Sequence, residues 1–419
     1  MKTKAVRMYG KNDLRLEEFE LPAMQPDEIL AKIITDSICM STYKAALQGA
    51  DHKRVPKGIA TNPVIMGHEF CGEVVEVGQR WQHQFQPGDR FVMQTALNYK
   101  GSMDAPGFSF PYVGGDATYV IIPSIVMEIG NLIKYDAQHY YRGSLVEPMS
   151  CIIGAFHASY HIEPGQYRHD MGIREGGSMA LLGSCGPMGL GAIDYALHAD
   201  RRPSLLVVTD IDDGRLARAA SIYTVEAAKK DGIRLVYMNT AKQADAVRAL
   251  RTLTQSGFDD VMVFAPVSAV IEQADGILGR DGCLNFFAGP TNTALSANFN
   301  FYNVHYGGTH VVGTSGGNTD DLREAVQLMN AGRIDPSSMI THVGGLDSVI
   351  ETTLNLPNIR GGKKLAYVQI NMPMIALEDL HKLGDTDKRY LELAGIVRKH
   401  NGLWSGEAEE CLLGIHADK

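Results

Sequence analysis

The sequence has little that would link it to a disulfide scaffold or a membrane. Its 419 residues include six cysteines, and no two of them form a CxxC pair. In a long chain, scattered cysteines are more typical of free thiols or metal ligands than of a disulfide framework. No run of 18 or more apolar residues is present, which argues against a transmembrane helix. The N-terminus also lacks the apolar stretch of a signal peptide, so we expect a cytoplasmic protein without membrane partners.

Excess positive charge is also absent. The formal net charge is −9, with 39 lysines and arginines against 48 acidic residues. This balance argues against a protein that binds nucleic acid by neutralising phosphates. The composition is 45% hydrophobic and 21% charged, as in ordinary globular proteins. A chain of this length has room for two or three domains, each with its own core.

Two kinds of secondary-structure pattern follow one another along the chain. The first 150 residues contain short strand-like runs bounded by Pro, Gly and Asp, and the segment 98–115 is typical of a loop. From residue 151 onward, apolar strands alternate with helical patterns. The six candidate strands are 179–182, 205–208, 234–237, 261–264, 284–287 and 310–312. Their alternation with helices predicts an α/β fold with a doubly wound parallel sheet.

A glycine-rich turn follows the first of these strands and precedes a helical pattern. Such a turn binds a pyrophosphate because the backbone approaches closely and the helix N-terminus offers free N–H groups. The turn fits G-x-G-x-x-G imperfectly, because a serine occupies the first glycine position. The candidate cofactor-binding residues here are Gly183, Ser184, Gly186, Pro187, Met188 and Gly189. A tight strand–helix turn without a ligand would have a similar sequence.

Asp210 ends the next predicted strand, about 20 residues after the last glycine, where a carboxylate can accept hydrogen bonds from a ribose. This position favours NAD(H), because a carboxylate repels the 2′-phosphate of NADP(H). Arg215 on the following turn keeps NADP(H) possible. Asp210 is also an acceptable plain turn residue, and both interpretations remain open.

Three residue types suited to zinc occur far apart in the sequence. Cys39 lies in Ser37–Thr42, His68 and Glu69 lie in Gly67–Val75, and Glu147 lies in Leu145–Cys151. A thiolate, an imidazole and a carboxylate suit a catalytic zinc, which keeps three protein ligands and one open position. Spacing alone does not establish such a site, because single cysteines and histidines are more often core or hydrogen-bonding residues.

Several short motifs, in order, resemble the medium-chain, zinc-type alcohol dehydrogenase family. They are Gly67-His68-Glu69, Gly72-Glu73-Val74-Val75, Val77-Gly78 and Pro87-Gly88-Asp89-Arg90-Phe91. The pair Glu147-Pro148, followed by Cys151, resembles the polyol dehydrogenase branch of that family. More narrowly, the chain resembles sugar-phosphate reductases of the L-sorbose-1-phosphate reductase type. The resemblance covers roughly residues 1–370.

The resemblance implies a domain plan. Residues 1–150 would form a GroES-like catalytic domain, residues 151–316 a Rossmann domain, and residues 317–419 a segment that returns to the catalytic domain. Residues 159–177 lengthen the usual connection between the first two. The tail after residue 370 is longer than the family needs, with a helical pattern over 385–400 that places Leu391, Ala394 and Val397 on one face.

The resemblance also implies roles for individual residues. Cys39 and His68 match zinc ligands, and Glu147 matches the third ligand or the carboxylate next to it. Glu69 matches an acid beside the histidine that approaches the metal during turnover. Ser41 matches the hydroxyl that passes on the substrate proton. The sequence does not distinguish Glu147 from Glu69 as the third zinc ligand.

Departures from the family pattern affect the proton path and the second zinc. Lys44 stands where a histidine often ends the proton relay, so Lys44 is the candidate at that position. Met40 and Thr42 also differ from the usual residues. The segment 92–110 lacks the four cysteines of a structural zinc. We therefore expect one catalytic zinc and no structural zinc.

The expected reaction is hydride transfer between a nicotinamide cofactor and the hydroxyl or ketone of a sugar phosphate or polyol. The segment 44–57 has five basic residues, Lys44, His52, Lys53, Arg54 and Lys57, and one acid. It suits either a phosphate-binding patch or a solvated loop. The rival functions are a free-polyol or threonine dehydrogenase and a zinc-free reductase or nucleotide-binding protein. By resemblance, a homodimer or homotetramer would pair through 299–304 and 310–314.

Overall fold

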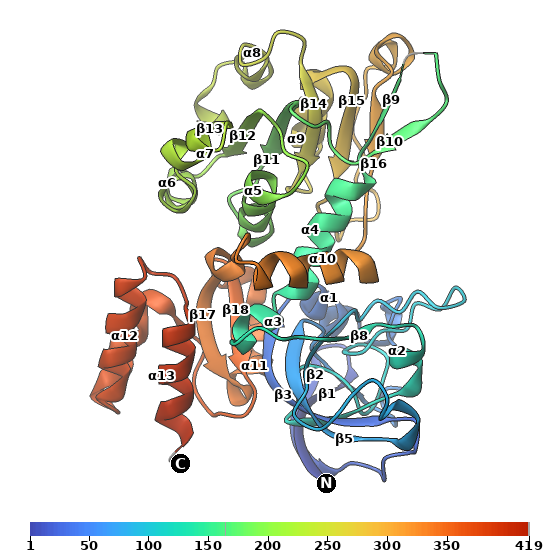
Figure 1. The fold of residues 1–419 in the computed structure, drawn as a ribbon, viewed down its shortest axis with the longest axis vertical. Helices are drawn as coiled ribbons and strands as arrows, with labels where there is room; N and C mark the ends of the chain where they lie inside the picture. Colours follow the sequence, from blue (N-terminus) through green and yellow to red (C-terminus); the bar gives the residue numbers. More distant parts are fainter. Residues whose placement is uncertain (164, 418–419) are drawn as a thin grey trace. The chain divides into compact units, whose positions relative to one another are not determined.

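The computed structural model describes residues 1–163 and 165–417, which divide into two compact units (Figure 1). Unit 1 comprises Met1–Glu147 and Pro336–Lys419, and unit 2 comprises Pro148–Asp335. This division places the helix Thr319–Asn330 in unit 2, whereas the sequence-based plan began the C-terminal segment at residue 317. Within the described residues, no helix is long and apolar enough to cross a membrane.

Unit 1 is built on a mixed sheet in the order β19-β17-β18-β3-β5-β6-β8, with β7 also paired to β3. Its strands are β3 (Ile29–Ile38), β5 (Phe70–Val77), β6 (Arg90–Met93), β7 (Tyr119–Ile122), β8 (Leu132–Lys134), β17 (Ile340–Gly345), β18 (Lys363–Tyr367) and β19 (Ile375–Ala376). A smaller sheet contains β2 (Asp13–Glu20), β1 (Lys2–Gly10) and β4 (Val64–Ile65). The pairing of β18 with β3 joins the C-terminal segment to the N-terminal strands.

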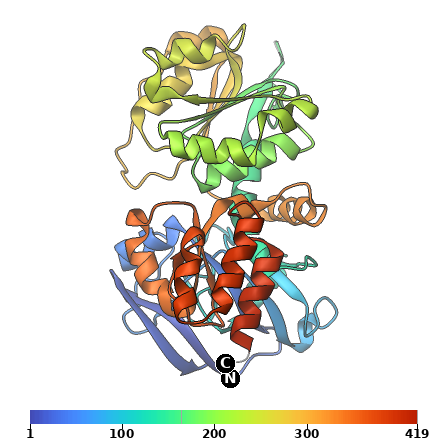
Figure 2. The ribbon, with the colours of Figure 1, turned by 90° about the vertical axis from the view of Figure 1, so that its left-hand side faces the viewer.

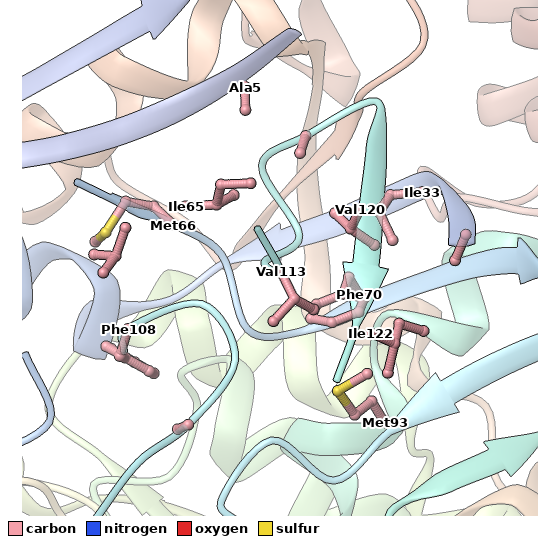
Figure 3. Close-up of a cluster of buried hydrophobic side chains, with 14 of the residues drawn as sticks. Ala5, Ile33, Ile65, Met66, Phe70, Met93, Phe108, Val113, Val120 and Ile122 are labelled. Carbon is pink, nitrogen blue, oxygen red and sulfur yellow. The ribbon is translucent and has the colours of Figure 1, made fainter. Parts of the chain in front are cut away.

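The core of unit 1 supports the segment that carries the predicted metal ligands. Met66 and Phe70 are buried and flank Gly67-His68-Glu69 on both sides (Figure 3). Phe108, from the loop predicted over 98–115, is also buried in this cluster. Because both neighbours of this short segment are anchored in the core, the backbone between them has little freedom to move.

The helices of unit 1 are short and lie between or beside the strands. They are α1 (Met40–Gln48), α2 (Ser124–Glu128), α3 (Tyr140–Gly143), α11 (Val349–Asn355), α12 (Arg389–Lys399) and α13 (Gly406–Ala417), and α4 (Val146–Ala158) runs from unit 1 into unit 2. The tail also contains a 3-10 segment, η8 (Leu377–Asp385).

Unit 2 contains the predicted doubly wound sheet. Its six strands are all parallel, in the order β13-β12-β11-β14-β15-β16. They are β11 (Ser178–Leu182), β12 (Leu205–Asp210), β13 (Arg234–Asn239), β14 (Phe258–Val263), β15 (Leu278–Phe286) and β16 (His310–Val312), so all six predicted strands are confirmed. The helices of this unit are α5 (Pro187–His198), α6 (Asp213–Ile222), α7 (Val225–Lys230), α8 (Ala246–Arg251), α9 (Ser268–Ile277) and α10 (Thr319–Asn330). The α/β fold class predicted from the sequence is confirmed.

The lengthened connection over 159–177 contains an antiparallel pair of short strands. The strands are β9 (Tyr160–Ile162) and β10 (His169–Met171), and they form a two-stranded sheet of their own. Residue 164 lies outside the described residues.

The C-terminal tail folds onto unit 1 (Figure 2). The predicted helix over 385–400 is observed as α12, but its predicted apolar face is partly wrong. Leu391 is 48% exposed, whereas Leu393, Ala394 and Val397 are buried. The last helix, α13, was not predicted from the sequence. Together α12 and α13 cover a hydrophobic cluster that also includes residues of β17 and β18.

Candidate metal and nucleotide sites

Cys39, His68 and Glu69 meet in unit 1. One ligand atom from each residue lies within 4.8 Å of the other two. Cys39 follows β3 directly and caps the start of α1, whereas His68 and Glu69 immediately precede β5. The turn between β4 and β5 requires Gly67, whose φ is 86° and where a Cβ would overlap the backbone of Asp116.

Two hydroxyl groups contact the imidazole of His68. The Ser41 Oγ lies 3.0 Å from the Cys39 Sγ and 3.2 Å from the His68 Nε2. The Thr42 Oγ1 lies 3.1 Å from the His68 Nδ1 on the other side of the ring. A hydrogen bond from Nδ1–H to Thr42 leaves the Nε2 lone pair on the side of Cys39 and Ser41. Such a partner fixes both the tautomer and the ring orientation of a metal-binding histidine.

Glu69 is engaged by a buried lysine. The Lys363 Nζ donates to both carboxylate oxygens of Glu69, each at 2.6 Å. Both side chains are almost fully buried. Burial opposes the charged form of Lys363, but the charge of Glu69 and its hydrogen bond to the ammonium group outweigh burial and raise the pKa of Lys363. The ammonium group is therefore charged and holds Glu69 in place.

Glu147 lies in the first turn of α4, in unit 1. Burial lowers the pKa of His68 and the charge of Glu147 opposes this, and the same charge contributes to the raised pKa of Lys363, so the carboxylate lies near both side chains. It is not part of the group whose ligand atoms lie within 4.8 Å of one another. The acid in that group is Glu69, which is already bound by Lys363 at both oxygens.

The protonation of the site suits a cation. Burial, together with the charge of Glu69, raises the pKa of the Cys39 thiol to about 12. Burial also lowers the pKa of His68, which keeps its imidazole neutral. A divalent cation reverses the preference of the thiol, because it stabilises the thiolate directly. Sulfur, nitrogen and carboxylate donors in one largely buried cluster match the chemistry of zinc.

The basic segment 44–57 is less positively charged than its sequence suggests. Burial and the neighbouring charges of Lys53 and Arg54 lower the pKa of His52 to about 4, so this histidine is neutral near pH 7. The His52 ring stacks on Phe108, with centroids 5.7 Å apart, and Phe108 packs on His68 at 4.6 Å. The sequence-based expectation that His52 is one of the cations of this segment is therefore wrong.

Lys44 and Arg54 lie near this aromatic stack. Lys44, on α1, is half-buried, and its charge lowers the pKa of His52. The Arg54 guanidinium donates to the Met103 carbonyl at 2.9 Å, and its charge lowers the pKa of His68. Two cations therefore lie close enough to act on the histidines of the site. Lys44 and Ser41 both belong to α1, as the predicted proton path requires.

The glycine-rich turn joins β11 to α5 in unit 2. Gly183 has a φ of 66°, and Gly186 caps α5, with Pro187 as its first residue. A Cβ at Gly189 would overlap the carbonyl of Ser184, whereas a Cβ at Gly186 would meet nothing. Met188 is half-buried between these glycines. The turn therefore has a tightly packed glycine and an open one, as a pyrophosphate-binding turn requires.

Asp210 ends β12 and contacts this turn. Its carboxylate accepts N–H groups of Cys185 at 3.1 Å, Ile211 at 2.8 Å and Asp212 at 3.1 Å. The side chain is 5% exposed. It thus performs the turn-stabilising role that the sequence left open, and it retains lone pairs for a further donor. Arg215 is exposed on α6. Burial and the charge of Asp210 raise the pKa of the Cys185 thiol, and the charge of Arg215 opposes this.

Lys363 is the main residue of the metal cluster that the sequence interpretation missed. It begins the run Lys363-Lys364-Leu365-Ala366-Tyr367, which forms β18 and is buried at every position. Two lysines at the start of an otherwise apolar strand were the available signal. The partner Glu69 is 294 residues away, so no local pattern connects the two.

Comparison with known families agrees with this geometry. The model of the alcohol dehydrogenase GroES-like domain matches residues 25–131, and that of the zinc-binding dehydrogenase matches residues 187–331. The chain is 51% identical to the L-sorbose 1-phosphate reductase of Klebsiella pneumoniae over 416 residues, 99% of this chain and 98% of that protein. It is also 51% identical to the mannitol-1-phosphate 5-dehydrogenase of Aliivibrio fischeri over 415 residues, with the same coverage of both chains.

Solved structures agree on the fold. The 2R,3R-butanediol dehydrogenase of Bacillus subtilis superposes with a TM-score of 0.70 at 24% identity, which covers 87% of this chain and 99% of that one. A zinc-binding dehydrogenase of Sinorhizobium meliloti, bound to NADP, gives 0.70 at 21% identity, which covers 88% of this chain and 99% of that one. Combined with the two relatives at 51% identity, these matches show that the chain is an oxidoreductase of the medium-chain, zinc-binding alcohol dehydrogenase family.

Proposed function

We propose that this protein is a zinc-dependent reductase or dehydrogenase that transfers a hydride between a nicotinamide cofactor and a sugar phosphate, either a ketose phosphate or the corresponding polyol phosphate. The observation that carries the proposal is the group of partly buried Cys39 and buried His68 and Glu69, with Glu147 nearby. The two relatives at 51% identity are named for sorbose 1-phosphate and mannitol 1-phosphate.

We assign Cys39, His68 and Glu147 as the zinc ligands and Glu69 as the adjacent acid. The ion pair with Lys363 favours this assignment, because a Glu69 ligand would have to give up a buried ammonium partner. Zinc bound there would polarise a ketone oxygen and lower the pKa of the corresponding hydroxyl.

The protein's own groups would orient the site and move the proton. Thr42 holds the His68 ring so that Nε2 faces Cys39. The Ser41 hydroxyl, within 3.2 Å of the His68 Nε2, would hold the substrate proton at its Oγ and pass it on. Lys44, on the same helix, stands at the position from which the proton would leave.

The phosphate of the substrate would lie against Arg54 and Lys44. Arg54 offers a planar guanidinium that can bind phosphate oxygens in pairs, and its charge already acts on His68. We expect Arg54→Gln to lower kcat/KM about tenfold for a ketose 1-phosphate, and to leave the weak reduction of the free ketose unchanged. Arg15→Gln, an exposed arginine on β2, is the matched control. Equal loss on both substrates would contradict a phosphate role for Arg54.

NAD(H) is the favoured cofactor, because Asp210 ends β12 beside the glycine-rich turn. Its carboxylate would accept the ribose hydroxyls and repel a 2′-phosphate. The exposed Arg215, in the first turn of α6, would allow NADP(H) at lower efficiency. We expect kcat/KM for NADH to exceed that for NADPH, and Asp210→Asn to reduce the ratio about tenfold. A higher kcat/KM with NADPH in the unmodified protein would contradict the NAD(H) assignment.

Two other functions are distinguished by the same assays. A free-polyol or threonine dehydrogenase would turn over unphosphorylated substrates as well as phosphorylated ones. A zinc-free reductase or nucleotide-binding protein would bind no metal. The test is therefore a substrate panel with and without phosphate, together with metal analysis of the purified protein. About one zinc per chain and a preference for phosphorylated substrates support the proposal, and full reductase activity without zinc would overturn it.

We further propose that the protein is a homodimer or homotetramer. β16 is the last strand in the sheet order of unit 2 and carries the exposed Val311, and the exposed Phe301, Tyr302 and Tyr306 shortly precede it in sequence. An edge strand with exposed apolar residues suits pairing with a second copy. Light scattering of the protein and of a Val311→Lys variant would test this, since a dimer formed there should dissociate in the variant.

A further inference from the structure

The last helix carries a buried carboxylate that belongs to a network in unit 1. Glu409, on α13, is 2% exposed. It accepts the backbone N–H groups of Tyr140 and Tyr141, each at 2.8 Å, and the hydroxyl of Tyr367 at 2.9 Å. A buried carboxylate with three donors is satisfied, and removing its charge leaves buried donors without an acceptor.

The first two of these donors begin α3, which leads directly to Glu147. Helix α3 spans Tyr140–Gly143, and only Ser144 and Leu145 separate it from the first residue of α4. Ser144 and Leu145 are fully buried. The backbone N–H of Ser144 donates to the Tyr140 carbonyl at 3.2 Å. A displacement of the start of α3 would therefore be transmitted to Glu147.

Helix α3 is held from two sides. On one side, Tyr141 and Leu145 belong to the same hydrophobic cluster as Leu393 and Leu412 of α12 and α13. On the other side, the Thr35 hydroxyl of β3 donates to the Tyr140 carbonyl at 3.0 Å. The C-terminal helices, which lie beside each other in Figure 2, thus provide one of the two surfaces between which α3 is packed.

The third donor connects Glu409 to the other acid of the site. Tyr367 is the last residue of β18, and Lys363, which binds Glu69, is the first. The indole N–H of Trp404 donates to the same Tyr367 hydroxyl at 2.8 Å. Burial and the charge of Glu409 raise the pKa of Tyr367 well above its usual value, so the hydroxyl remains a donor. The Glu409 carboxylate therefore contacts α3, which precedes Glu147 in the chain, and β18, which carries the Lys363 partner of Glu69.

We propose that Glu409 is a positioning residue of the metal site, through which the C-terminal helices hold Glu147 in place for the metal. This inference rests on the proposed zinc ligands Cys39, His68 and Glu147. The relatives at 51% identity match 99% of the chain.

The test is Glu409→Gln, which keeps the size of the side chain but replaces one acceptor oxygen by an NH2 group. We expect the rate at which zinc passes to a chelator to rise about tenfold. We also expect the increase in Tm on zinc binding to become smaller than in the unmodified protein. In the cobalt-substituted protein, the visible d–d bands should shift, because the position of one ligand has changed. Glu410→Gln, at the neighbouring exposed position, should alter none of these quantities.

The outcomes separate positioning from a general loss of stability. The inference is overturned if Glu409→Gln lowers the Tm of the zinc-free and the zinc-bound protein by the same amount and leaves the cobalt bands and the rate of zinc release as in the unmodified protein. If Glu409→Gln does not fold, the milder variant Tyr367→Phe replaces it, because it removes only one donor to Glu409. We expect zinc release from Tyr367→Phe to be about threefold faster than from the unmodified protein. Unchanged zinc release from Tyr367→Phe would also overturn the inference. If the unmodified protein binds no zinc, the proposed function itself fails.

Discussion

The ammonium group of Lys363 lies 2.6 Å from each carboxylate oxygen of Glu69, and both side chains are shielded from solvent. The pair joins β18 to the residue before β5, although the two are 294 positions apart in the chain. Because Glu69 lies within 4.8 Å of the Cys39 and His68 ligand atoms, the lysine sets the charge available to the metal site. Without Lys363, a buried carboxylate would face the thiol of Cys39.

Lys363→Met should destabilise unit 1 strongly, because it leaves the Glu69 carboxylate buried without its partner. Breaking a buried ion pair on one side costs about 3–5 kcal/mol. The double variant Lys363→Met with Glu69→Gln removes both charges, and we expect it to recover at least half of that loss. Urea unfolding of the three proteins measures the effect. If Lys363→Met is as stable as the unmodified chain, the ion pair does not contribute to the free energy of unfolding.

Cys39→Ser should abolish stoichiometric zinc binding, because the thiolate is the softest ligand of the proposed set and a serine hydroxyl ionises poorly. We expect less than about a tenth of the unmodified zinc content and a similar loss of kcat. Cys411→Ser, a partly buried cysteine on α13, is the matched control and should retain both. Elemental analysis after dialysis measures zinc content. Full zinc content in Cys39→Ser would exclude this cysteine as a ligand.

The parts of the fold that the sequence predicted are those with local signals. The sequence predicts all six strands of the parallel sheet in unit 2, because buried parallel strands are short apolar runs bounded by turns. Helix α12 was predicted from its period, but Leu391 was placed on the wrong face. The sequence period alone does not say which face of a helix near the end of a chain meets the core, and here Leu393 does.

The parts of the site that the sequence missed depend on contacts between distant segments. Short motifs predict that Cys39, Ser41 two residues after it, and His68 belong to the site. The contacts of Lys363 with Glu69 and of Glu409 with Tyr140 span 294 and 269 positions. Local patterning carries no information about such pairs. The neutral state of His52 was missed for a similar reason, because burial under Phe108 is not visible in a list of basic residues.

The two glycines of the nucleotide turn should respond differently to alanine. At Gly189 a Cβ would overlap the Ser184 carbonyl, so Gly189→Ala should lower the free energy of unfolding by about 1–3 kcal/mol. At Gly186 a Cβ meets no protein atom, and φ is −81°, which alanine adopts freely. Gly186→Ala should therefore fold normally but bind NADH about tenfold more weakly, because the methyl group occupies the space of the pyrophosphate. Thermal unfolding and NADH fluorescence titration measure the two effects. Unchanged NADH affinity in Gly186→Ala would remove the turn from the cofactor site.

The stability of unit 2 should fall as the pH rises from about 6.5 to 9. His157 on α4 lies 2.7 Å from Asp321 and 3.3 Å from Glu324, and its hydrogen bonds to Asp321 and then Glu324 raise its pKa to about 9. An unfolded histidine has a pKa near 6.5. Because the folded value is the higher one, the stabilisation is fully present below pH 6.5 and is lost as the pH approaches 9.

The imidazole is about half-exposed, with a side chain 49% accessible, so solvent screening reduces the expected change to about 1–2 kcal/mol. His157→Asn keeps a donor for Asp321 but has no proton to lose, and its free energy of unfolding should not show this decline. His83→Asn, an exposed histidine of unit 1, should behave like the unmodified protein. Urea unfolding at pH 6, 7.5 and 9 measures the slope. An identical decline in His157→Asn would assign the pH dependence to other groups of unit 2, such as His161 and His198, whose pKa values are also raised.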